Sequence, residues 1–271
     1  MIASVQEQFP DTIFLSEAFT RPMVMKYLAK SGFTQSYSYY TSRNSRLEIE
    51  EYFTELYQTE VRHFMRPNLF ANTPDILPEI LQTGGPPAFT IRFLLAATLG
   101  ATYGIYGPPF EQYVGEPLAP GKEEYLDSEK YVVRHWDWSS HQPFRELIGL
   151  VNRIRRDIPA LQFDHYLRFH HCENQEILFF SKQDPHGQSA ALVIVSLNPY
   201  DAQSGWVHVP IDLFGIQPDE SYQVHDHITG AFYQWHGAAN FVSLNPHSAP
   251  AHILTIRRQQ RREQDFDYYF A

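Results

Sequence analysis

Residues 12–39, TIFLSEAFTRPMVMKYLAKSGFTQSYSY, decide the predicted fold. The stretch opens with the apolar run 12–15, which has the length of a short strand. Pro22 fits the first turn of a helix that continues to about Lys30. Residues 33–39 are rich in Thr and Tyr and predict a second strand. Strand, helix and strand in this order indicate one unit of a parallel β/α fold.

The same alternation continues downstream. Helical patterns and strand-like runs follow one another at 46–64, 67–71, 89–98 and 102–106. Four such units make half of a (β/α)8 barrel, and they do not make the usual beginning of one. After Pro108 comes a loop of about thirty residues, and loops of this length inside a domain are often functional.

The pattern changes after a helical segment at 144–157. Seven strand-like runs, separated by short turns, follow between about residue 163 and residue 257. This spacing is typical of an antiparallel β-sandwich. We therefore predict a partial catalytic barrel at 1–160, a C-terminal β-sandwich at 161–257 and a disordered tail at 258–271. The fold class is α/β plus all-β.

Composition excludes several classes of protein. The 21 Lys and Arg residues against 31 Asp and Glu give a net charge of −10, which argues against a nucleic-acid or anionic-membrane partner. No apolar run is long enough to span a membrane, and the first residues do not resemble a signal peptide. Cys172 is the only cysteine, so an intramolecular disulfide is excluded, and we expect this thiol to be inert. A cytoplasmic location fits this cysteine usage.

Two carboxylates stand where a β/α barrel places its working groups, at the C-terminal ends of strands. Glu17 ends the first predicted strand, and Asp75 follows the third. A carboxylate pair can perform acid–base chemistry on an acetal. The alternative is that each carboxylate caps a helix or pairs with a neighbouring arginine. Nearby aromatic residues favour a sugar ligand, because sugar rings stack on aromatic faces; they are Tyr37, Tyr39, Tyr40 and Phe70.

Other chemistries find little support. His170 and His171 are adjacent on a strand and point to opposite faces, whereas His225 and His227 share a face without a third ligand. We therefore expect structural roles for these histidines and no metal site. The chain contains no P-loop, no GxGxxG string and no GxSxG elbow.

Five strings together resemble one family. They are IFLSEAFTRP at 13–22, GFTQSY at 32–37, NTPDILP at 72–78, EYLDSEKY at 124–131 and LRFHH at 167–171. They resemble the bacterial α-1,4-glucan:maltose-1-phosphate maltosyltransferases of the α-amylase superfamily (glycoside hydrolase family 13). The resemblance runs from about residue 10 to about residue 257, and it implies that the four β/α units are the C-terminal half of a (β/α)8 TIM barrel, approximately strands five to eight. Its most specific feature is Asn-Thr-Pro-Asp, where ordinary amylases carry Asn-His-Asp.

The resemblance implies a retaining transfer of maltosyl units from α-maltose 1-phosphate to the non-reducing end of an α-1,4-glucan, as in glycogen biosynthesis. Glu17 resembles the general acid/base, and Asp75 the carboxylate that stabilises the transition state. Lys130 and Tyr131 resemble the pair that contacts the donor disaccharide. No cofactor is implied. The implied partners are the donor, maltooligosaccharide or α-glucan acceptors, and either a second copy in a homodimer or a complementing N-terminal half.

One departure from the family pattern is serious. The family's nucleophilic aspartate follows strand four, upstream of Glu17, and the only aspartate there is Asp11, which resembles the start of strand five. The nucleophile is therefore expected to be absent, and the isolated chain to be inactive. Two alternatives stay open at this point: a non-catalytic glucan-binding or interaction fragment, and an amylase-like hydrolase or branching enzyme.

Overall fold

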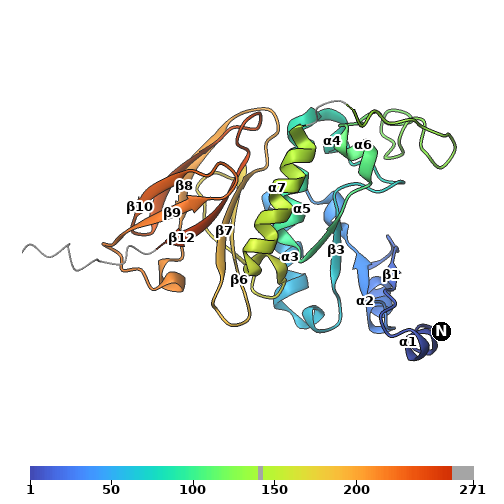
Figure 1. Ribbon diagram of the computed structural model, residues 1–271, viewed down its shortest axis with the longest axis horizontal. Coiled ribbons are helices and arrows are strands. Elements are labelled where there is room, and N and C mark those ends of the chain that lie inside the picture. The colour runs from blue at the N-terminus through green and yellow to red at the C-terminus, as the bar shows by residue number, and fades with distance from the viewer. Residues whose placement is uncertain (140–142, 258–271) are drawn as a thin grey trace, which may run out of the picture.

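The computed structural model describes residues 1–139 and 143–257. Figure 1 shows a parallel sheet at one end of the molecule, antiparallel sheets at the other, and a group of helices between them. The predicted tail at 258–271 lies outside the described residues. No helix in the described ranges is long and apolar enough to cross a membrane.

The parallel sheet has four strands in sequential order. They are β1 (Leu15–Ser16), β2 (Gln35–Tyr37), β3 (Pro67–Phe70) and β4 (Thr102–Gly104). Leu15 pairs with Gln35 and Asn68 pairs with Thr102, so all strand ends with the same polarity lie along one edge of the sheet. The predicted strand at 12–15 is therefore wrong in its bounds, because pairing with β2 begins only at Leu15.

Helices connect these strands in the predicted order, but the helix predicted at 46–64 ends at Gln58 and a separate 3-10 turn follows it. α2 (Pro22–Lys30), α3 (Arg46–Gln58) and α5 (Gly85–Leu99) follow β1, β2 and β3 in turn. Ser45 begins α3 with a capping box, in which its side chain accepts from the Glu48 amide and the Glu48 carboxylate accepts from the Ser45 amide. The remaining short helices are α1 (Ile2–Gln8), α4 (Glu79–Thr83), α6 (Gly107–Glu111), η1 (Tyr39–Ser42) and η2 (Glu60–His63).

Eight further strands form two antiparallel sheets. The larger sheet has the order β10-β9-β12-β7-β6-β5, and β11 pairs with β8 in the smaller one. β12, the last strand along the chain, thus lies between β7 and β9. The bounds are β5 Arg168–Phe169, β6 Ile177–Gln183, β7 Ala190–Ser196, β8 Gln203–His208, β9 Ser221–Asp226, β10 Phe232–His236, β11 Ala239–Leu244 and β12 Ala251–Arg257, with η4 at Ile211–Phe214.

The two antiparallel sheets share one hydrophobic core. Ile194 and Leu254 of the larger sheet are buried together with Val207 and Leu244 of the smaller sheet. The opposite face of β6 and β7 belongs to a second core, which continues into α5 and the parallel sheet. Both faces of β7 are therefore covered, which explains its uninterrupted apolar sequence.

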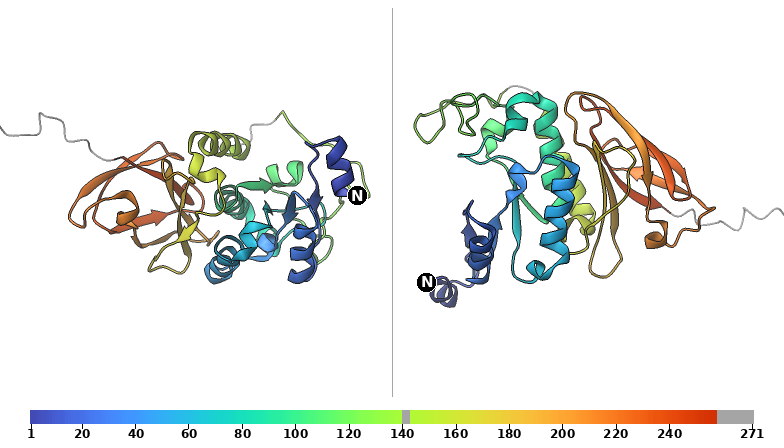
Figure 2. Two further views of the ribbon diagram at one scale, coloured as in Figure 1. Left: turned by 90° about the horizontal axis from the view of Figure 1, so that it is seen from below. Right: turned by 180° about the vertical axis from the view of Figure 1, so that it is seen from behind.

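Helices fill the space between the parallel and antiparallel sheets. α7 (Pro143–Asp157) packs against α5, and α5 in turn contacts β7 (Figures 1 and 2). η3 (Pro159–Gln162) ends this layer. Basic side chains hold the end of α5, because Lys182 donates to the Leu99 carbonyl and Arg155 donates to the carbonyls of Gly100 and Ala101.

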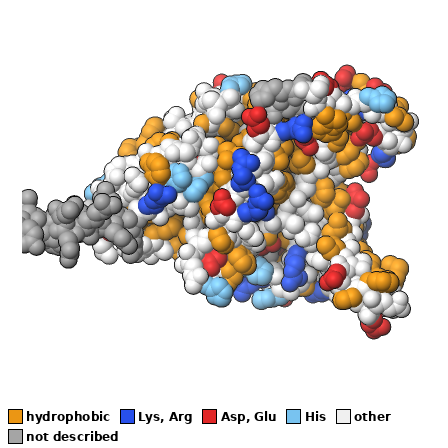
Figure 3. All heavy atoms as spheres, in the orientation of Figure 1, with side chains coloured by type: hydrophobic (Ala, Val, Ile, Leu, Met, Phe, Trp, Pro, Cys, Tyr) orange, Lys and Arg blue, Asp and Glu red, His pale blue; other side chains and the backbone are white. Residues whose placement is uncertain are grey.

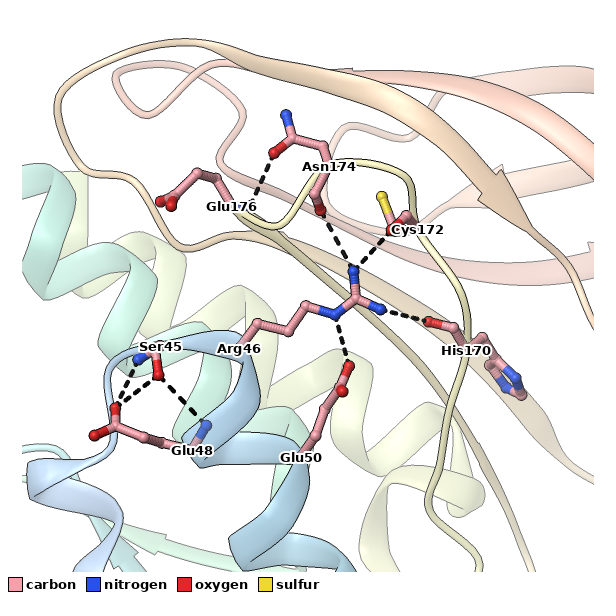
Figure 4. Close-up of polar contacts among 8 residues, drawn as sticks. All are labelled: Ser45, Arg46, Glu48, Glu50, His170, Cys172, Asn174 and Glu176. Atoms are coloured by element: carbon pink, nitrogen blue, oxygen red, sulfur yellow. Dashed lines mark hydrogen bonds and ion pairs between the residues drawn. The ribbon is translucent and has the colours of Figure 1, made fainter.

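A second polar connection joins α3 to the antiparallel part of the chain. Figure 4 shows Arg46 reaching from the first turn of α3 toward the segment that leads into β6. Its guanidinium donates to the backbone carbonyls of Cys172 at 2.8 Å and His170 at 3.4 Å, and to the Glu50 carboxylate at 2.7 Å. One partly buried side chain therefore satisfies groups from both parts of the molecule.

Candidate active site

Polar and aromatic side chains gather where the parallel strands end. Glu17 follows β1, and the 71–75 segment follows β3. β2 lies between these strands, which places the two strand ends about 10 Å apart. The irregular segment 112–139 passes over the same edge, at the upper right of Figure 1.

Asp75 and Lys130 meet at this edge. The Lys130 Nζ lies 2.5 Å from Asp75 Oδ1, and the ammonium also lies 5.5 Å from the centre of the Tyr131 ring. The hydrogen bond from Lys130 to the Asp75 carboxylate raises the pKa of this lysine above its usual value. Both charged side chains and the Tyr131 ring are exposed, so a ligand can reach all three.

Glu17 belongs to a different part of the edge. Among the described residues, no hydrogen bond or ion pair links Glu17 to Asp75 or Lys130. Its charge acts on Tyr37 of β2: burial, and then the Glu17 charge, raise the pKa of the Tyr37 hydroxyl. Glu17 is exposed at the end of β1.

Aromatic rings lie between the two carboxylate-bearing ends. Tyr37 and Phe70 have ring centroids 4.4 Å apart, and Phe19 meets Tyr37 edge-on at 5.9 Å. Gly104 makes room for this group, because a Cβ at that position would lie 2.5 Å from the Phe70 ring. These three rings therefore form an apolar surface beside Glu17.

The other two predicted aromatic residues pack with the hydrophobic core: Tyr40 lies within it, and Tyr39 packs against it. Tyr40 is fully buried, and its hydroxyl donates to the Arg92 carbonyl at 2.5 Å. Tyr39 packs edge-on against Tyr52 with the centroids 6.2 Å apart. The 3-10 turn at Tyr39–Ser42 directs Tyr40 toward α5, whereas the Tyr39 hydroxyl donates to the Thr20 carbonyl in the segment that follows β1.

A hydrogen-bond network that the sequence analysis missed holds the segment that carries Lys130. The buried Asn72 side chain binds both the amide and the carbonyl of Tyr106 and donates to the Tyr125 hydroxyl at 2.7 Å. The Tyr106 hydroxyl donates to Glu129, as does the Trp136 indole at 2.9 Å. These two hydrogen bonds lower the pKa of Glu129. Asn72 lies within the NTPD string and Glu129 within the SEKY string, so these motifs could have identified both residues as candidates.

The histidines and the cysteine have structural surroundings. His170 Nε2 lies 2.7 Å from Ser181 Oγ, and burial lowers the pKa of this imidazole to about 4. His227 Nε2 lies 2.8 Å from Thr255 Oγ1. Burial raises the pKa of the Cys172 thiol, as expected for an inert cysteine. In the part of the chain that the structure describes, no group of three His, Cys, Asp or Glu side chains could hold a metal.

Comparison with known sequences identifies relatives over nearly the whole chain. An enzyme of Chlorobaculum tepidum named α-1,4-glucan:maltose-1-phosphate maltosyltransferase is 47% identical over 94% of this chain and 39% of its own length. The enzyme of the same name from Myxococcus xanthus is 47% identical over 99% of this chain and 40% of its own length. A family model described as "GLGE, C-terminal" matches residues 169–256.

The chain resembles the C-terminal part of the maltosyltransferases. It spans about two fifths of the length of these curated maltosyltransferases. Solved α-amylases share its fold: those of Anoxybacillus and Geobacillus thermoleovorans each superimpose with a TM-score of 0.66, at 11% and 12% identity. They cover 94% and 95% of this chain but 54% and 56% of their own chains.

Proposed function

We propose that this chain is the C-terminal part of a retaining maltosyltransferase that transfers maltosyl units from α-maltose 1-phosphate to the non-reducing end of α-1,4-glucans. The observation that carries the proposal is the Asp75–Lys130 pair at the end of a parallel strand, in a sequence 47% identical to enzymes of that name. The proposed division into a partial barrel at 1–160 and a β-sandwich at 161–257 belongs to the same proposal.

In this scheme the reaction runs in two displacements. An aspartate from outside this chain attacks the anomeric carbon of the donor, and the bond from that carbon to the phosphate oxygen breaks. Glu17 assists departure of phosphate as general acid. The 4-hydroxyl of the acceptor then attacks the maltosyl–enzyme ester, Glu17 accepts the hydroxyl proton, and the aspartate is released. No cofactor enters this scheme.

Asp75, Lys130 and Tyr131 hold the donor. The Asp75 carboxylate stabilises positive charge on the sugar ring in the transition state and accepts hydrogen bonds from donor hydroxyls. Lys130 orients Asp75 through their ion pair and offers its remaining N–H groups to the donor. The exposed Tyr131 ring supplies an apolar surface for the disaccharide.

The missing half of the barrel would complete the parallel sheet. β1 and β4 each pair with only one strand among the described residues, which leaves two open edges. Apolar side chains near β1 are exposed, including Ile13 at 66% and Leu15 at 46%. Figure 3 shows the molecule hollowed on this side, with hydrophobic side chains around the hollow. A closed barrel would cover both features.

Phosphate release tests the proposal. The chain is incubated with α-maltose 1-phosphate and maltohexaose, with and without a separately expressed N-terminal part of one of the maltosyltransferase relatives. We expect phosphate from the mixture and none from either part alone. The matched control is the same mixture with Glu17→Gln, which should release at least about a hundredfold less phosphate.

The products separate this function from the alternatives. Elongation of maltohexaose by two glucose units supports the transferase. Release of maltose from glycogen in water would instead show a hydrolase. Phosphate from the chain alone would contradict the absence of the nucleophile.

A further inference from the structure

An aromatic-lined cavity lies on the antiparallel part of the chain, whose strands β10 and β12 are far from the parallel strand β3 in Figure 1. It measures about 210 Å³ and is bounded by β10, β11 and β12. Tyr233 and Phe241 line it while being 38% and 55% exposed. The sequence analysis and the proposed catalytic scheme use neither residue.

Phe241 extends this cavity into a longer aromatic surface. Trp206 of β8 is directly opposite Phe241 of β11 in the strand register, and the two ring centroids are 5.6 Å apart. Trp206 is 45% exposed. The rings of Tyr233 and His252, whose centroids are 5.9 Å apart, also line the cavity. Two ring pairs therefore flank one depression, which is how a chain of sugar rings can be held by stacking.

Polar groups lie between these rings. β11 pairs with β8 on one side, and no other strand in the described part of the chain pairs with its second side. The backbone N–H and C=O groups along that open edge are thus free to bind hydroxyls. The Ser243 hydroxyl also lines the cavity. His252 is fixed by the hydrogen bond between its Nδ1 and Asp226 Oδ2, 2.9 Å apart.

The charge of the lining selects the class of ligand. None of the cavity's lining residues carries a carboxylate, an ammonium or a guanidinium group. A phosphorylated or acidic ligand would find no counter-charge there, whereas a neutral polyhydroxylated ligand needs none. Its volume is below the roughly 300–1,000 Å³ of pockets that enclose a drug-sized ligand, which suits shallow contact with one ring of a longer chain.

We propose that Trp206, Tyr233, Phe241 and the open edge of β11 form a second, non-catalytic binding site for neutral α-glucan chains. Resting on the proposed function, such a site would keep a long acceptor attached to the protein between successive transfers. It is separate from the site at Asp75, since it contacts the polymer and takes no part in bond making or breaking.

Titration calorimetry of the full chain with maltoheptaose, without any phosphorylated donor, tests the site. We expect weak binding that falls about tenfold in Phe241→Ala and in Trp206→Ala. Phe241→Tyr keeps the ring and should retain binding. Tyr166→Ala is the matched control, because Tyr166 is 40% exposed and lies outside the cavity.

The design separates this site from the proposed active site. Binding that is unchanged in Lys130→Ala and Tyr131→Ala, yet lost in Phe241→Ala, supports the second site even when phosphate release fails. Absence of maltoheptaose binding overturns it, as does full binding in both Phe241→Ala and Trp206→Ala. Concentration-dependent dimers that Ser243→Pro abolishes would also overturn it, because the occupant of the β11 edge would then be another strand.

Discussion

The Lys130 ammonium lies 2.5 Å from the Asp75 carboxylate, and this contact fastens the 112–139 segment to the end of β3. A backbone hydrogen bond of 2.5 Å from the Leu77 amide to the Glu123 carbonyl makes a second connection between the same two segments. The loop is therefore held over the strand ends at Asp75 and again at Leu77. The carboxylate is presented to solvent in a fixed position rather than on a free loop.

Removal of the lysine charge should impair transfer more than folding. In the complemented enzyme we expect Lys130→Met to lower the rate of phosphate release by about a hundredfold, because Asp75 loses its orienting partner and the donor loses a contact. Lys122→Met is the control, since Lys122 is an exposed lysine of the same segment. Equal rates in the two variants would contradict the role given to Lys130.

Glu129 should act through Lys130. Glu129→Ala removes the acceptor of both Tyr106 and Trp136, so we expect faster hydrogen exchange in the 123–136 segment and a higher KM for the donor, with a smaller change in kcat. Glu129→Gln keeps an acceptor oxygen and should restore much of both. Glu123→Ala is the control on the same segment. Exchange unchanged in Glu129→Ala would show that the network does not hold the loop.

Arg46 should matter for stability without affecting chemistry. Arg46→Ala leaves the Cys172 and His170 carbonyls without this donor, and we expect a loss of about 1–3 kcal/mol in the free energy of unfolding. Arg46→Lys should recover only part, since an ammonium cannot match the planar fork of donors. Urea unfolding measures both, with the exposed Arg66→Ala as control. If Arg66→Ala lowers the free energy of unfolding as much as Arg46→Ala does, the hydrogen bonds of Arg46 do not explain its contribution to stability.

Lys182 should make the stability rise with pH. Burial lowers its pKa to about 7, with Asp164 opposing and Arg155 adding to the shift. The unfolded chain, with a lysine pKa of about 10.4, then binds more protons than the folded chain between pH 7 and pH 10. The free energy of unfolding should increase through this window by up to about 1.4 kcal/mol per pH unit.

Urea unfolding at pH 7, 8 and 9 measures this slope. Lys182→Met should flatten it, whereas the exposed Lys122→Met should leave it unchanged. A slope that is equal in the wild type and in Lys182→Met would mean that the lysine stays protonated in the folded protein.

Helices were the most predictable part of the fold. The bounds predicted for Pro22–Lys30 match α2, because a proline at the start and a glycine after the end mark both limits. Gly85 and the two prolines after it have a composition typical of a turn, yet they form the first turn of α5. Proline is compatible with that position, since the first amides of a helix have no intrahelical partner.

Strand limits and side-chain partners were less predictable. The apolar run at 12–15 marks a strand, yet only pairing with Gln35 determines that the strand starts at Leu15. Asp75 and Lys130 could be named from motifs, but their contact depends on the path of the long loop between them. Tyr40 illustrates the opposite error: its place near Tyr37 in the sequence suggested a sugar platform, whereas the 3-10 turn buries it against Arg92.

The place of β12 has a consequence for the order in which the chain can fold during synthesis. The parallel sheet contains all its described strands once residue 104 has emerged from the ribosome. The larger antiparallel sheet cannot join β9 to β7 until residues 251–257 emerge, since that strand lies between them. From the emergence of Ser196 until that of Ala251, β7 therefore lacks its neighbour along one edge, and a ribosome that stalls in this interval would leave a nascent chain that depends on chaperones.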